Sequence, residues 1–158
     1  MVISLRRMED QDIENVLQLE IKDEQTQYVS PITTMLSTLE PSEDCHLLVK
    51  EDEIVGFFII DQNYWRRYDF SKPGEIGLLG YFVDARHQGR GVGKAGVQAL
   101  KSYLHIQYPD AQAVILTVNC RNLGAIKTYL AGGFEDTQQL YYGGRSGPQH
   151  IMRLTLKE

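Results

Sequence analysis

Apolar residues recur along this chain with two different periods, and the change of period locates its central strands and its longest helix. Residues 54–60 read IVGFFII, a continuous apolar run typical of a strand covered on both faces of a sheet. Residues 76–83 predict a second strand. From Val92 to about Leu104, apolar or small residues return at the spacing of one helix face, so we expect a helix to follow that strand.

The same patterns, with turn residues between them, place the remaining elements. Strands are predicted over residues 3–6, 46–50, 113–118, 134–142 and 150–156, and helices over residues 10–21, 30–39 and 122–130. Ser30 is expected to cap the second of these helices, with Pro31 at its first position. Residues 61–74 are expected to form a loop. No repeat or linker interrupts the pattern, so residues 1–158 are expected to be one domain.

The turn between the strand at 76–83 and the helix is rich in glycine. Gly89, Gly91 and Gly93 remove side chains where the strand passes into the helix. Backbone N–H groups can therefore approach an anion closely, and the positive end of the helix dipole adds to the attraction. This turn is predicted to hold a phosphate group.

Two common phosphate-binding motifs fit this turn poorly. The Walker pattern fails twice, because Gln88 stands where its first glycine belongs and Ala95 stands where it requires serine or threonine. The dinucleotide pattern GxGxxG matches at Gly91, Gly93 and Gly96, but it also requires an acidic residue after the next strand, where residues 119–121 read NCR. A GxGxxG match alone is weak evidence.

A third motif fits together with its surroundings. Residues 88–93 read QGRGVG, which resembles the pyrophosphate signature of the GNAT N-acetyltransferase superfamily, Gln/Arg-x-x-Gly-x-Gly/Ala. Downstream, residues 122–134 follow the spacing N-x-x-A-x-x-x-Y-x-x-x-G-F. Both signatures occur in order, with a helix and a strand between them, and the resemblance covers nearly the whole chain. It implies an α+β, three-layer fold with a central mixed sheet, whose strands at 75–83 and 113–118 splay apart around an acyl carrier.

The resemblance assigns the acyl donor, acetyl-CoA, to this gap. Backbone amides of the glycine turn would hold its pyrophosphate, the main chain of the preceding strand would pair with its pantetheine arm, and Asn122 would hydrogen-bond the carrier. The implied binding residues are Tyr81, Phe82, Val83, Gln88, Gly89, Arg90, Gly91, Val92, Gly93, Lys94 and Asn122. Asn122 and Tyr129 also have plain structural readings, as a helix N-cap and a core aromatic residue.

The chemistry of amine acetylation suggests two catalytic roles. A primary amine, with a pKa of about 10.4, must lose a proton before it attacks a thioester, and the departing thiolate benefits from a proton donor. Tyr129 lies near the sulfur in the family and is the predicted general acid. Many relatives carry a glutamate base at the position of Gly77, so Glu75, two residues earlier on the same strand face, is the nearest substitute. Alternatively, Glu75 is a solvated charge at the strand end, and the base is Glu24, His46 or a water chain.

The acceptor is expected to be a small molecule with a primary amine. In the superfamily, acceptor specificity is set by the segment between the first two helices and by the last loop. Residues 20–29 resemble that segment in bacterial spermine/spermidine and diamine acetyltransferases, where Glu20, Asp23 and Glu24 would bind a second ammonium group. These carboxylates equally fit a solvated helix end. Two other functions remain open: acetylation of a protein N-terminus or lysine, and a non-catalytic acyl-CoA sensor.

Composition removes several other classes. The net charge of −5 argues against nucleic acid as a partner. The apolar runs are too short for a bilayer, and no signal peptide is recognised, so we expect no membrane association and a cytoplasmic location. Two cysteines, Cys45 and Cys120, form neither a disulfide framework nor a metal motif, and no metal is expected. A homodimer is expected, because many members of the superfamily pair through their C-terminal strands.

Overall fold

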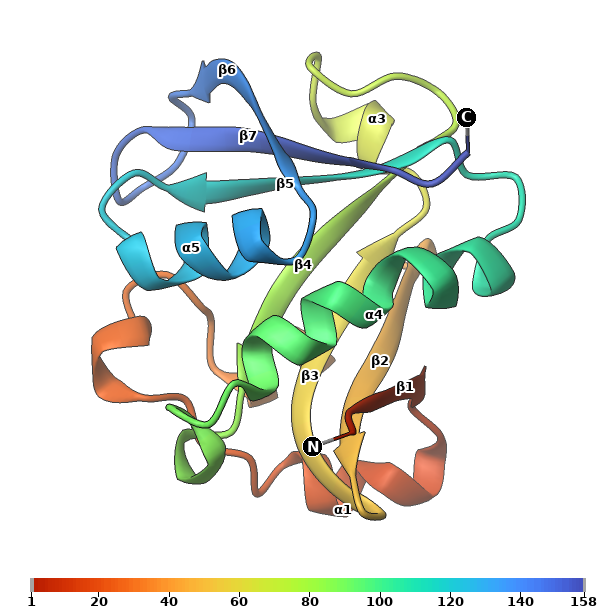
Figure 1. Ribbon diagram of the computed structural model, residues 1–158, viewed down its shortest axis with the longest axis vertical. Helices are drawn as coiled ribbons and strands as arrows, with labels where there is room; N and C mark the ends of the chain where they lie inside the picture. The colour runs from red at the N-terminus through yellow and green to blue at the C-terminus, as the bar shows by residue number, and fades with distance from the viewer. Residues whose placement is uncertain (1, 158) are drawn as a thin grey trace.

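A seven-stranded mixed sheet runs through the middle of the molecule in the order β1-β2-β3-β4-β5-β7-β6 (Figure 1). The structure is a computed structural model and describes residues 2–157. The strands are β1 (Ser4–Arg7), β2 (Glu43–Lys50), β3 (Glu53–Asp61), β4 (Glu75–Val83), β5 (Ala113–Asn119), β6 (Glu135–Tyr141) and β7 (Gln149–Thr155). Among the strands of the described residues, only β4 and β5 pair in parallel, and every other neighbouring pair is antiparallel.

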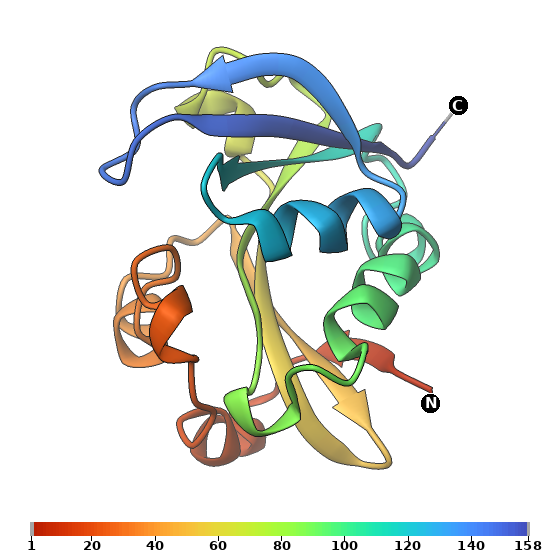
Figure 2. The same ribbon diagram turned by 60° about the vertical axis from the view of Figure 1, so that its left-hand side comes forward.

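Helices cover both faces of this sheet, which gives three layers. The α-helices are α1 (Ile13–Val16), α2 (Ile32–Ser37), α3 (Tyr64–Arg67), α4 (Val92–Gln107) and α5 (Leu123–Ala131). The 3-10 helices are η1 (Asp10–Asp12), η2 (Asp23–Gln25) and η3 (Ala85–His87). Figure 2 shows α4 and α5 on one side of the sheet and the N-terminal helical segments on the other. The described part of the chain contains no helix that is both long and apolar enough to cross a membrane.

The apolar run in β3 is buried on both faces, as its sequence predicts. Phe58 and Ile60 pack in the cluster that contains the buried face of α4. Phe57 and Ile59 point to the opposite face, where they join residues of α1 and α2 in a second cluster. Alternate side chains of one strand therefore hold the two helical layers together.

β4 and β5 share only a short stretch of pairing. Glu75, Ile76 and Gly77 pair with residues 113–115, and beyond this point the two strands separate (Figure 1). The register between β3 and β4 shifts nearby, where Gly80 has a left-handed φ of 62°. A bulge of this kind bends and twists a strand, and it lies where β4 turns away from β5.

The predicted helix over residues 10–21 is wrong in its extent. The chain forms η1 and the single turn α1, and then leaves the helical path. Its start is fixed by Asp12, whose carboxylate accepts hydrogen bonds from the Glu9 N–H and the Arg6 guanidinium. The helix ends early because the backbone of Glu20 bonds elsewhere: its N–H donates to the Asp84 carboxylate, and its carbonyl accepts from the Ala85 N–H. Contacts with the end of β4 replace further helical hydrogen bonds.

Two other predictions need smaller corrections. The second helix, α2, is shorter than predicted, and extended Pro31 (ψ 145°), not Ser30, is its N-cap residue. The predicted loop over residues 61–74 contains α3, which buries Tyr64 to 1% exposure against Tyr68 and Phe70. Local aromatic packing therefore creates a helical turn that periodicity does not predict.

A hydrogen-bonded histidine lies inside the sheet layer, away from the splayed strands. His46 is fully buried, its ring stacks on Phe58, and its two nitrogens lie 2.7 Å from the hydroxyls of Tyr103 and Tyr108. The Tyr108 hydroxyl donates to Asp44, so it accepts from His46 Nε2–H, and Nδ1 accepts from Tyr103. This arrangement fits the neutral ring. Burial, and then the Arg7 charge, lower the pKa of His46 to about 4.

Because His46 is neutral in the fold and has an ordinary pKa of 6.5 when exposed, the unfolded chain binds the extra proton first. The free energy of unfolding should therefore fall as the pH drops from about 6.5 to about 4, by roughly 3 kcal/mol. Urea denaturation at several pH values measures this loss. His46→Gln, which keeps polar groups but does not titrate, should flatten the dependence. An equal pH dependence in both proteins would contradict the assignment.

Candidate active site

The glycine-rich turn between β4 and α4 presents a row of free backbone donors. Gly91 is the N-cap of α4 with a φ of 78°, and Gly89 has a φ of 76°, both in the left-handed region that favours glycine. The first helical hydrogen bond of α4 runs from the Ala95 N–H to the Gly91 carbonyl at 3.0 Å. Within the described chain, the amides of residues 89–94 donate to no backbone carbonyl. These amides lie at the N-terminal end of the sixteen-residue helix α4, where the helix dipole is positive and an anion can bind.

A groove of about 340 Å³ runs from this turn between β4 and α5. Its lining comprises Gln25, Tyr81, Phe82, Val83, Gln88, Gly89, Gly91, Val92, Gly93, Lys94, Gly124, Ala125, Thr128 and Tyr129. We call it the donor groove. Of the residues predicted to bind acetyl-CoA, only Arg90 and Asn122 are absent from this lining. Free amides, a helix N-terminus and a partly apolar channel fit a phosphate-bearing carrier with a flexible arm.

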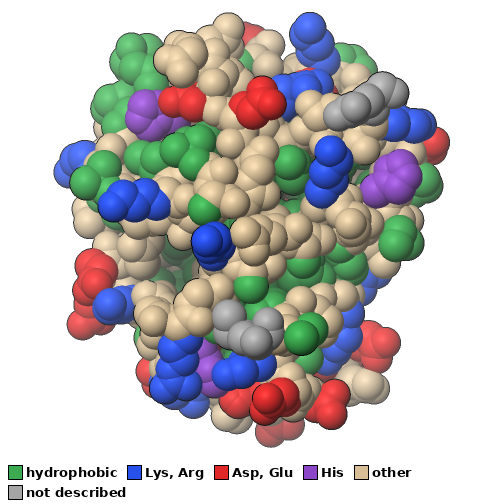
Figure 3. Space-filling view, in the orientation of Figure 1, with side chains coloured by type: hydrophobic (Ala, Val, Ile, Leu, Met, Phe, Trp, Pro, Cys, Tyr) green, Lys and Arg blue, Asp and Glu red, His purple; other side chains and the backbone are tan. Residues whose placement is uncertain are grey.

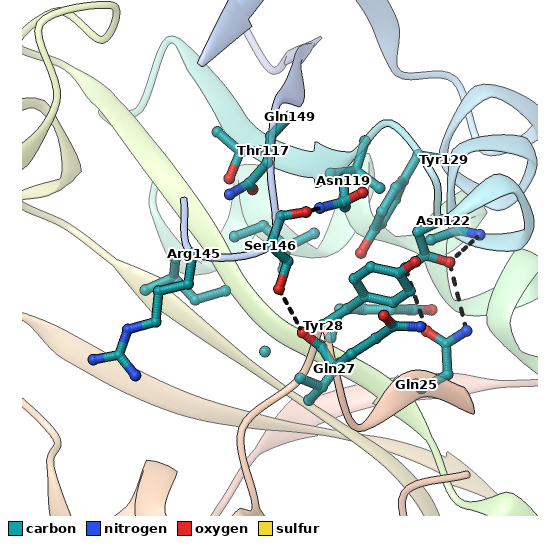
Figure 4. Close-up of a pocket in the computed structure, with 17 residues that line it drawn as sticks. Gln25, Gln27, Tyr28, Thr117, Asn119, Asn122, Tyr129, Arg145, Ser146 and Gln149 are labelled. Atoms are coloured by element: carbon teal, nitrogen blue, oxygen red, sulfur yellow. Dashed lines mark hydrogen bonds between the residues drawn. The ribbon is translucent and has the colours of Figure 1, made fainter. Parts of the chain in front are cut away.

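A second cavity, of about 330 Å³, lies where β4 and β5 separate (Figure 4). We call it the acceptor cleft. Its lining comprises Gln25, Gln27, Tyr28, Val29, Leu78, Leu79, Gly80, Tyr81, Thr117, Val118, Asn119, Asn122, Ala125, Tyr129, Arg145, Ser146 and Gln149. The walls come from both splayed strands, from α5 and from two segments that cross the opening.

Those two crossing segments are tied to the rest of the cleft. Gln25 and Asn122 exchange side-chain amide contacts at 3.3 and 3.5 Å, while Asn122 also caps α5 through the Ala125 N–H (Figure 4). The Ser146 hydroxyl, from the loop between β6 and β7, donates to the Gln27 carbonyl at 3.2 Å. The cleft is thus bridged on the side opposite the sheet.

Tyr129 lies where the donor groove and the acceptor cleft meet. It lines both cavities, together with Gln25, Tyr81 and Ala125. Its ring packs edge-on against Tyr81 and Phe134. Burial raises the pKa of the Tyr129 hydroxyl well above its ordinary value, so the phenol is protonated at neutral pH. Within the described chain, this hydroxyl makes no protein hydrogen bond, which leaves it available as a donor.

Glu75 is held away from both cavities. Its carboxylate accepts from the Lys72 N–H at 2.7 Å and from Ser71, and it pairs with Arg153 at 3.3 Å. It lies at the end of β4 that is still paired with β5, and it lines neither cavity. Gly77 offers no alternative, because a Cβ at this position would overlap the Tyr64 ring.

The three acidic residues predicted to bind a second ammonium also lie outside the acceptor cleft. Glu20 is exposed and holds the end of β4 through its backbone. Asp23 is exposed, and Glu24 pairs with Lys22 at 3.0 Å. The other candidate bases are displaced as well, since neither Glu24 nor His46 lines the cleft. Within residues 2–157, no group of three or more histidine, cysteine or acidic residues is placed to hold a metal.

Tyr81, Asn122 and Tyr129 were named from the sequence and line the cleft, whereas the other polar lining residues were not predicted. Gln25, Gln27 and Tyr28 follow directly after the acidic residues that were predicted, and Arg145 and Ser146 lie in the last loop. Both segments were expected to set acceptor specificity. Which residues in each face inward depends on the hydrogen bonds that tie the segments across the cleft, and no periodic pattern records those bonds.

Comparison with known proteins agrees with this geometry. The model of the acetyltransferase (GNAT) family matches residues 6–134, so the chain belongs to that family. The expected GNAT fold, N-acetyltransferase class and acetyl-CoA donor are thereby confirmed.

Individual relatives cover most of the chain. The spermine/spermidine N(1)-acetyltransferase of Bacillus subtilis (strain 168) is 28% identical over 150 residues, which span 91% of this chain and 95% of the relative. The structure of aminoglycoside acetyltransferase AAC(6')-Ib with coenzyme A and kanamycin superposes with a TM-score of 0.77 at 21% identity, covering 97% of this chain and 94% of that one. The spermidine N-acetyltransferase of Vibrio cholerae with CoA and spermine gives a TM-score of 0.70 at 16% identity, covering 98% and 95%.

Gly93→Val tests the donor groove. A Cβ on Gly93 would lie 3.5 Å from Val83 and 3.7 Å from Thr128, in ordinary contact, so the variant should fold. The branched side chain would fill the groove, and the dissociation constant of acetyl-CoA should rise about tenfold or more as contacts to the free amides are lost. Isothermal titration calorimetry measures it, and Gly93→Ala should cause a smaller rise. Unchanged binding in folded Gly93→Val would place the phosphates elsewhere.

Proposed function

We propose that the protein transfers the acetyl group of acetyl-CoA to a primary amine of a small molecule. One observation carries the proposal: the donor groove and the acceptor cleft are adjacent and share Tyr129 in their walls. An acyl carrier whose phosphates bind the glycine-rich turn would present its thioester at this junction. An amine in the cleft would reach the same point from the other side, so the two reactants meet without a covalent enzyme intermediate.

A small acceptor is favoured over a protein chain because the cleft is bridged. The contacts of Gln25 with Asn122 and of Ser146 with Gln27 cross the path that an extended peptide would need. The named activities of the relatives support the same class, since they include spermine/spermidine acetylation and a kanamycin complex. The matching curated spermine/spermidine relatives, at 27–28% identity, make a polyamine one candidate acceptor.

In the proposed reaction, the lone pair of the neutral amine bonds to the thioester carbonyl carbon and the carbon–sulfur bond breaks. The sulfur leaves with its electron pair and takes a proton from the Tyr129 hydroxyl, the donor at the junction. The acceptor ammonium loses its first proton to water before the attack, because no carboxylate or histidine among the described residues lines the cleft. The proton that the nitrogen still carries after the attack passes through water to the Tyr129 phenolate, which restores its hydroxyl. The neutral amides of Gln27, Asn119 and Gln149 can hold such water without competing for the proton.

Incubation with acetyl-CoA, a panel of amines and a free-thiol reagent tests the function. Acceptor-dependent release of CoA is expected. Tight acetyl-CoA binding without any acceptor-dependent release would instead indicate a non-catalytic sensor.

Tyr129→Phe tests the general acid. The substitution removes only the hydroxyl, so the packing against Tyr81 and Phe134 should be kept. We expect kcat to fall about 100-fold, a typical general-acid effect, with little change in acetyl-CoA affinity or Tm. Tyr68→Phe, which removes a partly buried hydroxyl outside both cavities, is the matched control. A wild-type kcat in Tyr129→Phe would remove this residue from the mechanism.

The water-mediated proton loss predicts a distinctive pH profile. Without an enzymic base, kcat/KM should rise about tenfold per pH unit from pH 6 to 9, because the neutral fraction of an amine with a pKa of about 10.4 grows in that proportion. Steady-state rates at saturating acetyl-CoA measure the profile. A plateau reached near pH 7 would reveal a titrating base on the protein and overturn this part of the mechanism.

We also propose a cytoplasmic homodimer joined through the C-terminal strands. β6 is the outer edge of the sheet, its pairing with β7 is interrupted, and Leu140 and Tyr142 are exposed there. A free strand edge with apolar side chains favours pairing with a second copy. Light scattering should give twice the chain mass of 18.0 kDa, and a monomer mass would end the proposal. Cell fractionation tests the location.

A further inference from the structure

Among residues 2–157, no acidic side chain lines the acceptor cleft. The polar lining that these residues supply consists of neutral amides, hydroxyls and a single charged residue, Arg145. This composition contrasts with the whole chain, whose net charge is −5, and Figure 3 shows acidic and basic side chains dispersed over one face of the molecule. A second ammonium group would find no opposite charge in the cleft and would meet a cation, whereas an anionic group would be attracted.

Arg145 lies in the loop between β6 and β7, and hydrogen bonds hold the next residue, Ser146. The Ser146 carbonyl accepts hydrogen bonds from Asn119 at 2.9 Å and Arg121 at 2.6 Å, and its hydroxyl donates to Gln27. These three contacts fix the backbone beside Arg145. Figure 4 shows the Arg145 side chain at one end of the group of lining residues, with its guanidinium pointing away from Asn122 and Tyr129.

The guanidinium of Arg145 has no carboxylate partner. Among residues 2–157, no acidic oxygen lies within 4.0 Å of it, while five other arginines, including Arg67 and Arg153, form such pairs. Its donors are therefore available to a ligand. A guanidinium binds carboxylates and phosphates well, because its planar fork matches two of their oxygens.

We propose that the acceptor is a primary amine that also carries an anionic group, a carboxylate or a phosphate, and that Arg145 binds this group. The inference rests on the proposed function, since it assigns the second end of the same acceptor. With its anion at Arg145, the molecule spans the cleft and directs its amine toward the junction at Tyr129. The amides of Gln27 and Gln149 supply neutral hydrogen bonds along the way.

Acidic residues do occur in an adjoining groove, which shares Tyr28 and Gly80 with the cleft. Glu43 is already engaged, because it accepts the Glu40 N–H at 2.7 Å and lies 3.7 Å from Arg67. Glu40 is exposed and free to meet a long polycation. A polyamine would pair one of its ammonium groups with Glu40, so a substitution of Glu40 serves as the control for polyamine binding.

The test compares two acceptors that are matched in length and differ in the charge at their far end, together with two further amines. β-Alanine and 1,3-diaminopropane have the same three-carbon spacing, and phosphoethanolamine adds a phosphate, while spermidine represents the polyamines. Acceptor-dependent CoA release gives kcat/KM for each compound. The anionic amines should exceed the diamine by about tenfold or more, as expected for a charged hydrogen bond. Comparing β-alanine with phosphoethanolamine separates carboxylate from phosphate.

Two substitutions at Arg145 identify the source of that preference. Arg145→Gln should remove the advantage of the anionic amines, mainly through KM, and Arg145→Glu should reverse it in favour of 1,3-diaminopropane. Glu40→Gln should change nothing. Both positions are exposed, so folding should be unaffected in all three variants, and circular dichroism checks it.

Four results would overturn the inference. Equal rates for the matched pair, or an equal loss for every acceptor in Arg145→Gln, would leave Arg145 without a role in specificity while the acetyltransferase stands. Preferred turnover of spermidine that is lost in Glu40→Gln would assign the acceptor to the polyamines. An absence of release with every amine would instead remove the proposed function, and the inference with it.

Discussion

The parallel contact between β4 and β5 is the feature on which the rest of this molecule depends. It lasts for three residue pairs, and then the strands separate with their facing edges unpaired. Backbone groups at such edges need partners from water, side chains or a ligand. The gap therefore creates the acceptor cleft, and it leaves one edge of β4 open toward the donor groove. The bulge at Gly80 turns β4 away where the separation begins.

The net charge of this chain and the charge of its acceptor cleft differ in sign. The chain is acidic, but its acidic side chains near the cleft are exposed or engaged in pairs, such as Glu24 with Lys22 and Glu75 with Arg153. The cleft keeps neutral amides and one arginine. Net charge therefore predicts solubility, but it does not predict what the cleft attracts.

How much the sequence predicts depends on the range of the interactions involved. The strand, glycine turn and helix around residues 75–107 were predicted well, because periodicity and glycine conformation act locally. The first helix was overextended because Asp84, some sixty residues away, takes the Glu20 N–H. Glu75 was a reasonable base from its position on the strand, but its engagement with Arg153 depends on how β7 packs. Side-chain roles that rest on distant partners are invisible to a pattern.

The Tyr64 ring over Gly77 has a consequence for how this enzyme can evolve. A glutamate at position 77 could not be accommodated while Tyr64 occupies that space. Removing Tyr64 first would leave a cavity beside Ala113 and Ile115, in the third core cluster, at a large cost in stability. The two changes are therefore epistatic, and neither is an easy first step. The proposed mechanism, which has no strand-borne base, therefore makes the rate depend on the ionisation of the acceptor.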